Sequence, residues 1–308
     1  MTLLVQILAA TLSTCPPILY ASLGEIFSER AGILNLGLEG IMLVGAVAGF
    51  IAGLNSESLT VAILVAMAAG AAVGLVYAFL TVTLQSNQTV AGLALVTVGG
   101  GLSGVLGRDV SGVAATVSFS NIAIPGLSQI PFIGPILFNQ NAMVYALYFL
   151  VPLAHIYIFK TRPGLKLRAL GENPSALDAA GSRVYVMRYL YIILGCSITA
   201  LGGAYITLAY TPTWMIGITA GKGWIAAALV IFASWKPFNA ALGALLFGGI
   251  EVLGTRMQTI GIPISSYFIN MLPYLLTVIV LILSTGNFRK TKSPVPAALG
   301  QAYDRESR

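Results

Sequence analysis

Long apolar stretches alternate along the chain with short polar or glycine-containing connections. Because the hydrocarbon core of a bilayer is about 30 Å thick, a helix needs about 20 apolar residues to cross it. On this rule the pattern predicts spanning segments at residues 4–23, 31–54, 59–84, 90–107, 142–159, 189–209, 224–235, 238–254 and 267–284. We therefore predict an all-α polytopic membrane protein of about 8–9 transmembrane helices.

The seventh of these segments, residues 224–235, is too short to cross a bilayer unaided. A helix of that length covers about 18 Å at a rise of 1.5 Å per residue. We expect it to be extended by residues 218–223, tilted or broken. Irregular backbone at membrane depth is tolerated only where it is buried in protein or lines a cavity, so a break here predicts a cavity beside it.

The composition removes several other classes of protein. The chain is 57% hydrophobic and only 8% charged, against roughly 25% charged residues in an ordinary globular protein. A nucleic-acid module is excluded, and a transmembrane β-barrel is disfavoured because its strands would alternate polar with apolar residues. The sequence holds no GxxxxGK[ST] phosphate loop, so the chain is not expected to hydrolyse a nucleotide itself. Its His, Cys and acidic residues do not cluster, and we expect no metal or cofactor site.

Basic residues are distributed unevenly along the 308 residues. Most of the 16 Lys and Arg lie in residues 160–188 and 289–308. If the connections alternate sides, these two stretches share one face of the membrane with Lys236. Cytoplasmic loops carry an excess of Lys and Arg, so we predict an external N-terminus and a cytoplasmic C-terminus.

This topology divides the chain into two parts. Residues 1–288 form the transmembrane domain, with a long cytoplasmic loop at 160–188 and a long external loop at 108–141. Residues 289–308 form a basic cytoplasmic tail. Only Arg108, Lys222 and Arg256 are expected near the external face.

Pairs of small residues four positions apart recur in the predicted spans. They are Gly45 with Gly49, Gly70 with Gly74 and Gly100 with Gly104. Such pairs let two helix backbones approach closely. We favour close packing within one bundle over dedicated dimer faces.

Polar side chains inside apolar spans are costly and usually functional or paired. Asn35 and Glu39 lie four residues apart in the second predicted span, where they would share one helix face. Glu251 lies in the eighth span and Asn270 in the ninth. Carboxylate and amide groups can exchange hydrogen bonds with the hydroxyls of a sugar or the edge of a base. We predict that these four residues line a solute pathway.

Structural roles for the same residues stay open. Glu39 could cap a neighbouring broken helix or pair with Arg30, and Glu251 could pair with Arg256. Asn270 could make an ordinary hydrogen bond between helices.

The cytoplasmic loop contains a predicted short helix. Asn173 is a preferred N-cap residue, Pro174 suits the first helical position, and Gly181 can adopt the left-handed conformation that ends a helix. A helix of about seven residues is unstable alone in water, so it needs a surface to lie on. That surface is its own bundle or the groove of a partner, and the alternative is a basic loop lying on anionic headgroups.

Three blocks of the sequence carry a resemblance to a known family. They read GEIFSERAGILNLGLEGIMLVGA, TRPGLKLRALGENPSALDAAG and GITAGKGWIAAALVIFASWKPFNAALGALLFGG. In this order they resemble ATP-binding cassette (ABC) importer permeases of the branched-chain amino acid, simple sugar and nucleoside group, the second block being similar to the coupling-helix loop. The patterns at residues 29–32 and 221–226 look more like nucleoside-type permeases served by basic-membrane-lipoprotein binding proteins than like ribose permeases.

The resemblance implies a type II ABC importer bundle in a bacterial cytoplasmic (inner) membrane. Its implied partners are two ABC ATPase subunits, a homologous second permease subunit or a second copy of this chain, and an extracytoplasmic solute-binding lipoprotein. The implied solute is a nucleoside or a related simple-sugar-like molecule. The residues implied to couple to the ATPase are Gly171, Glu172, Asn173, Pro174, Ala176, Leu177, Ala180 and Gly181.

Two other functions compete with this hypothesis. An ion-coupled secondary transporter would use Glu39, Glu251 and His155 as its coupling groups. An intramembrane enzyme is disfavoured because no nucleophile, base and orienting group occur at usable spacing. The titratable groups are few and scattered, which favours the ATP-driven importer.

Overall fold

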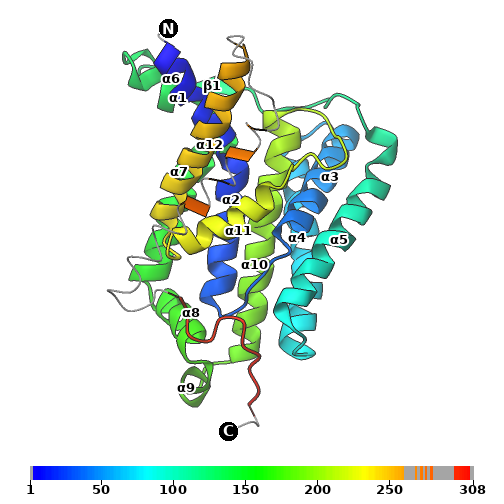
Figure 1. Ribbon diagram of the computed structural model, residues 1–308, viewed down its shortest axis with the longest axis vertical. Helices are drawn as coiled ribbons and strands as arrows, with labels where there is room; N and C mark the ends of the chain where they lie inside the picture. Colours follow the sequence, from blue (N-terminus) through cyan, green and yellow to red (C-terminus); the bar gives the residue numbers. More distant parts are fainter. Residues whose placement is uncertain are drawn as a thin grey trace.

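The computed structural model describes residues 3–259, residues 268, 271, 272, 275, 278 and 279, and residues 295–305 (Figure 1). In chain order its helices are α1 (Leu3–Thr14), α2 (Pro16–Arg30), α3 (Leu38–Ser56), α4 (Leu59–Ala78), α5 (Gln88–Leu106), α6 (Ile133–Leu137), α7 (Ala142–Lys160), α8 (Arg162–Glu172), α9 (Pro174–Ala179), α10 (Val184–Tyr205), α11 (Lys222–Phe232) and α12 (Pro237–Thr259). The short helical turns η1 (Phe79–Thr83) and η4 (Ile206–Tyr210) prolong α4 and α10, and η2 (Arg108–Val110) and η3 (Leu127–Gln129) lie in the long loop. The strands β1 (Asn121–Ala123) and β2 (Asn139–Asn141) pair antiparallel.

Six helices in the described residues are long and apolar enough to cross a membrane, and the bent pair α1–α2 raises the number to seven. The prediction of an all-α polytopic membrane protein is confirmed. Most of the predicted last span, residues 267–284, and Asn270 within it lie outside the described residues. Of the predicted tail, residues 295–305 are described.

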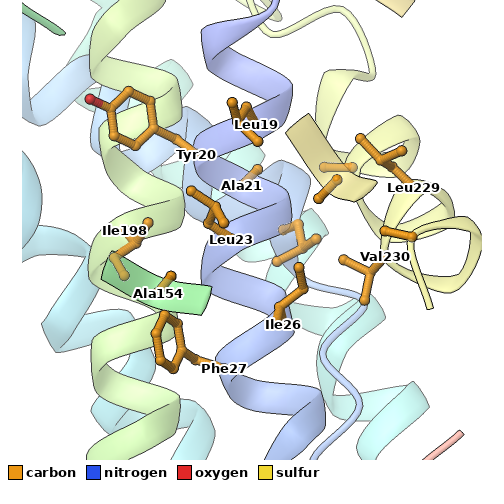
Figure 2. Packing of buried hydrophobic residues seen from close by; sticks show 14 of the residues in the cluster. Leu19, Tyr20, Ala21, Leu23, Ile26, Phe27, Ala154, Ile198, Leu229 and Val230 are labelled. Carbon is orange, nitrogen blue, oxygen red and sulfur yellow. The ribbon is translucent and has the colours of Figure 1, made fainter. Parts of the chain in front are cut away.

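Helix α2 runs through the middle of the bundle, and every one of its residues is buried. Figure 2 shows Leu23 and Ile26 of α2 beside Ile198 of α10 and Val230 of α11. A Cβ atom at Gly24 would lie 2.2 Å from the carbonyl oxygen of Gly195, so this glycine is what lets α2 and α10 pack backbone to backbone.

The first predicted span was wrong in its extent. Instead of one helix over residues 4–23, α1 ends at Thr14 and α2 continues to Arg30 after a bend of 42°. Pro16 and Pro17 cause the bend, because proline lacks the backbone N–H and is favoured at the first turn of a new helix.

The second predicted span was also wrong at its start, because residues 31–37 are not helical. Gly32 adopts a left-handed φ of 84° there. Side chains satisfy the freed backbone: Tyr77 donates to the carbonyl oxygen of Leu34 at 2.5 Å, and Gln88 Oε1 accepts from the Leu34 N–H at 2.8 Å. Such partners are required wherever irregular backbone lies inside a bundle. Asn35 therefore does not share a helix face with Glu39.

Two of the three predicted glycine pairs pack inside the bundle. A Cβ atom at Gly45 would lie 2.4 Å from the carbonyl oxygen of Ala200, and one at Gly70 would lie 2.5 Å from the Ala200 side chain. The prediction of close internal packing is confirmed for these positions. Added Cβ atoms at Gly100 and Gly104 of α5 would have no neighbour within 4 Å in the described part of the chain, so that pair does not pack there.

The seventh predicted segment, residues 224–235, is a short helix, α11, that does not cross a membrane by itself. The backbone after η4 runs along the long loop, where Gly112 N–H donates to the Trp214 carbonyl oxygen at 2.9 Å. Helix α11 then begins beside the first turn of α3 and ends beside the last turn of α2. Its 11 residues cover only about 16 Å. The prediction of a short or broken element in this region is confirmed.

The predicted short helix in the long basic loop is present as α9. Asn173 Oδ1 accepts from the Ala176 N–H at 2.9 Å, and Gly181 has the left-handed φ of 81°. Much of the remaining loop is helical too, because α8 follows α7 after a single turn residue. Helices α8 and α9 lie with the C-terminal segment at the end of the bundle opposite the N-terminus (Figure 1).

Candidate functional site

A cavity of about 520 Å³ lies between the last turns of α1, the end of α10 with η4, and the last turns of α12. Hydroxyl, phenol, amide and guanidinium groups line it together with a few apolar side chains. The lining residues are Ala10, Ser13, Thr14, Asn121, Asn141, Tyr205, Ala209, Tyr210, Val252, Thr255, Arg256 and Thr259. This mixture of donors, acceptors and aromatic rings suits a small polar solute.

The walls of the cavity are held by internal hydrogen bonds. Asn141 Nδ2 donates to the Tyr205 hydroxyl at 3.0 Å, and that hydroxyl donates to the Ser13 carbonyl oxygen at 2.8 Å. These bonds tie α1, α10 and strand β2 together. The cavity is therefore a preformed feature of the packing, as ligand sites usually are.

An ion pair lies next to the cavity. Lys222 Nζ is 2.6 Å from Glu251 Oε2 and 5.9 Å from the ring centre of Tyr210, which lines the cavity. The predicted alternative partner of Glu251 was wrong, since Arg256 lies among the cavity walls instead. Residues five apart on α12 point in different directions, whereas α11 brings Lys222 directly opposite Glu251.

Glu39 holds the start of α11. Its Oε1 accepts from the Thr219 hydroxyl at 2.5 Å and from the Gly221 N–H at 2.9 Å, and its Oε2 accepts from the Gly223 N–H at 2.7 Å. A carboxylate is stabilising at a helix N-terminus, where unpaired N–H groups and the helix dipole favour negative charge. The alternative that Glu39 caps a broken helix is confirmed, and its part in a solute pathway stays a prediction.

Asn35 is fully buried in the break between α2 and α3. Its Oδ1 accepts from the Gly37 N–H at 2.8 Å, and its Nδ2 lies 3.6 Å from the Cys196 sulfur. Both ends of the amide are engaged within the protein. Neither Asn35, Glu39 nor Glu251 is among the described residues that line the cavity.

Two buried carboxyl groups escaped the sequence analysis. Glu25 and Glu29 lie one turn apart on α2 and are 0% and 2% exposed. The predicted spans ended at residue 23 and resumed at residue 31, which placed both acids in a connection. The signal that could have found them is their spacing of four, which puts two carboxyl groups on one helix face.

Helix α9 in the long basic loop presents one inner and one outer face. Leu177 of α9 is buried and belongs to the main hydrophobic core of the bundle, together with Leu170 and Val184. Asn173, Ala176 and Ala180 are exposed on the outer side. The bundle supplies the surface that so short a helix needs. The described residues do not cover the outer side, so it is open to a partner.

The C-terminal segment lies across this end of the bundle. Ala298 N–H donates to the Gly171 carbonyl oxygen at 2.8 Å. The Tyr303 hydroxyl and Arg305 Nε both donate to Asp178 Oδ2 at 2.9 Å. Residues 295–305 thereby connect α8 and α9.

Comparison with known proteins places the chain among transport proteins. The family described as branched-chain amino acid transport system, permease component, matches residues 7–284. The chain is 35% identical to the putative glucose ABC transporter permease protein TsgC13 of Haloferax volcanii, over 97% of this chain and 98% of that one. It is 35% identical to the nucleoside ABC transporter permease protein NupC of Lactococcus lactis, over 96% of both chains.

A third relative is the guanosine ABC transporter permease protein NupQ of Bacillus subtilis, which is 32% identical over 94% of this chain and 96% of that one. The family match at residues 7–284 covers α2 to α12. No solved structure matches the chain.

Proposed function

The chain belongs to the family of permease components of branched-chain amino acid transport systems, and on that premise we propose that it carries a nucleoside or a related sugar-like solute. It is the membrane-spanning permease subunit of an ABC importer, a membrane component without a catalytic role of its own. The observation that supports the solute is the similarity, over nearly the whole chain, to permeases named for nucleosides, guanosine and glucose.

The proposed pathway includes the cavity between α1, α10 and α12. Its volume of about 520 Å³ falls in the range of about 300 to 1,000 Å³ that is common for small-molecule sites. Tyr210 offers an aromatic face to a base, and Ser13 and Asn141 offer groups that match ribose or hexose hydroxyls. Glu251 is linked to this cavity through Tyr210. Glu39 affects the cavity indirectly, because it holds the start of α11. Asn35 and Asn270 are proposed to meet the solute when the pathway opens.

Energy is proposed to come from partner ATPase subunits. The outer side of α9, with Asn173, Pro174, Ala176, Ala180 and Gly181, is the proposed docking surface, and Gly171, Glu172 and Leu177 connect it to the bundle. This assignment places α8 and α9 in the cytoplasm and the N-terminus outside, in accord with the basic residues of the loop.

Two further partners complete the proposed importer. A second permease subunit, homologous or identical, forms the other half of the membrane core. An extracytoplasmic solute-binding lipoprotein delivers the solute to the cavity end of the bundle.

The experiment is uptake into vesicles that contain the permease, its ATPase subunits and its binding protein. We expect internal ATP to drive accumulation of radiolabelled guanosine, and an ionophore to leave that accumulation unchanged. Unlabelled glucose and leucine serve as competitors that separate the solute classes. Competition by leucine alone would contradict the proposed solute. Loss of uptake with the ionophore, with ATP maintained, would support the ion-coupled transporter instead.

A further inference from the structure

We infer that Glu25 and Glu29 form a proton-binding site in the centre of the bundle, and that the bound proton fixes the position of the cytoplasmic end of α11. The site is distinct from the cavity and from the long basic loop. Its existence does not depend on the identity of the solute, and only its effect on uptake rests on the proposed transport function.

The two carboxyl groups act on each other inside the bundle. They are one turn apart on the same face of α2, both are buried, and the charge of Glu29 acts on Glu25. A buried carboxylate without a cation beside it is costly to ionise, so one member of the pair carries a proton. Two like charges in contact inside a bundle would otherwise repel each other strongly.

The contacts of each group show which one carries the proton. Glu25 Oε1 accepts from the Asn35 N–H at 2.9 Å. Glu25 Oε2 is buried and has no hydrogen-bond partner among the described residues, so we place the proton on this oxygen. Glu29 Oε2 accepts from the indole N–H of Trp235, which matches an ionised carboxylate.

The surrounding charges agree with this assignment. Arg30, the next residue on α2, lies on the Glu29 side and donates to the Trp235 carbonyl oxygen at 3.3 Å. Arg168 and Glu172 of α8 interact electrostatically with Arg30. On the Glu25 side the titratable neighbours are Tyr77 of α4 and Cys196 of α10, which are neutral in their ordinary forms.

Helix α11 is therefore anchored at both ends by acidic residues. Glu39 holds its first turn, and Glu29 holds Trp235 just after its last turn. Ser234 and Trp235 have left-handed φ values of 51° and 56°, a conformation that a non-glycine residue keeps only when its surroundings impose it.

Loss of this proton to solvent would place a second negative charge beside Glu29. The two carboxylates would then separate, and Glu29 would move away from the indole of Trp235. Because α11 carries Lys222 at its other end, next to the cavity, a shift of its cytoplasmic end reaches the solute pathway. Glu25 is thus a positioning residue that acts through Glu29 and Trp235.

The test compares wild type with Glu25→Gln across pH. The glutamine amide can still donate a hydrogen bond but has no proton to lose in this range. We expect wild-type uptake to fall by about threefold or more as the pH is raised through the range in which the protein stays folded, and uptake by Glu25→Gln to stay level. Glu57→Gln, which alters an exposed acid at the end of α3, should retain the wild-type profile.

An infrared measurement keeps the test independent of transport. Purified wild-type protein should show the absorption of a protonated carboxyl group, which disappears as the pH rises. Glu25→Gln should lack this band, and Glu57→Gln should retain it. Identical pH profiles for wild type and Glu25→Gln, or a wild-type band that Glu25→Gln leaves intact, would overturn the inference. A total absence of uptake with an intact band would contradict the proposed function but support the proton site.

Discussion

The backbone N–H of Gly223 donates to Glu39 Oε2 at 2.7 Å, which joins the first turn of α11 to the first turn of α3. A Cβ atom at position 223 would lie 2.5 Å from the Cα atom of Glu39. Only glycine permits so close an approach of the two backbones. The short helix next to the cavity is consequently fixed by one acid and one glycine that lie far apart in the sequence.

Gly223→Ala should therefore lower both stability and uptake. The added methyl group has no space, and such overpacking costs about 1–3 kcal/mol. Thermal unfolding in detergent and ATP-driven uptake measure the two effects. Gly249→Ala is the matched control, because its Cβ atom would lie 3.7 Å from the Thr11 side chain, an ordinary contact. Equal behaviour of the two variants would contradict this role for Gly223.

The Lys222–Glu251 ion pair is predicted to matter as a pair. Either Lys222→Met or Glu251→Gln leaves a partly buried charge without its partner, with an expected cost of about 1–3 kcal/mol. The double variant removes both charges and should recover part of the stability lost in the single variants. A double-mutant cycle on the unfolding midpoint measures the coupling. Strict additivity of the two single effects would show that the contact contributes nothing.

Asn35 provides a test of the predicted pathway. In a variant with Cys15 and Cys196 replaced, Asn35→Cys should resist polar thiol reagents at rest, because position 35 is fully buried. If the break between α2 and α3 opens during transport, labelling should appear with ATP and be reduced by solute. Resistance to labelling under all these conditions, with normal uptake, would leave position 35 as a packing position.

The two faces of α9 should respond differently to substitution. Ala176→Asp alters the exposed side and should abolish the stimulation of ATP hydrolysis by solute while leaving the unfolding temperature unchanged. Leu177→Asp places a charge in the main hydrophobic core and should lower the unfolding temperature as well. ATPase assays and thermal unfolding on the same samples separate these outcomes. Normal stimulation in Ala176→Asp would remove α9 from the proposed coupling surface.

Asp178 should control the attachment of the C-terminal segment. Asp178→Asn removes the charge that pairs with Arg305 and should speed trypsin cleavage after that residue, measured by mass spectrometry. Asp109→Asn, in the long loop at the other end of the bundle, is the control.

Burial and the hydrogen bond to Asp178 raise the pKa of Tyr303 above its ordinary value of 10.0. A raised pKa stabilises the neutral phenol, so attachment should persist below pH 10.0 and weaken as the pH rises through the raised pKa.

The sequence by itself determined the class, the family and the local elements of this protein. Apolar stretches of membrane-spanning length need no tertiary information, because each helix satisfies its own backbone hydrogen bonds. The α9 helix was predicted in the same way, since Asn173 and Gly181 act on their immediate neighbours. The family resemblance rested on blocks of residues that are contiguous in the chain.

Only the tertiary structure decided what the buried polar residues do. Hydropathy alone cannot show that α2 continues past residue 23, because Glu25 and Glu29 lower the local hydropathy and gain their partners only from Trp235 and Asn35. The choice of Lys222 over Arg256 as the partner of Glu251 depended on how α11 packs against α12. The partner of a buried charge is set by packing between distant segments, whereas a spanning helix is set by the local run of apolar residues.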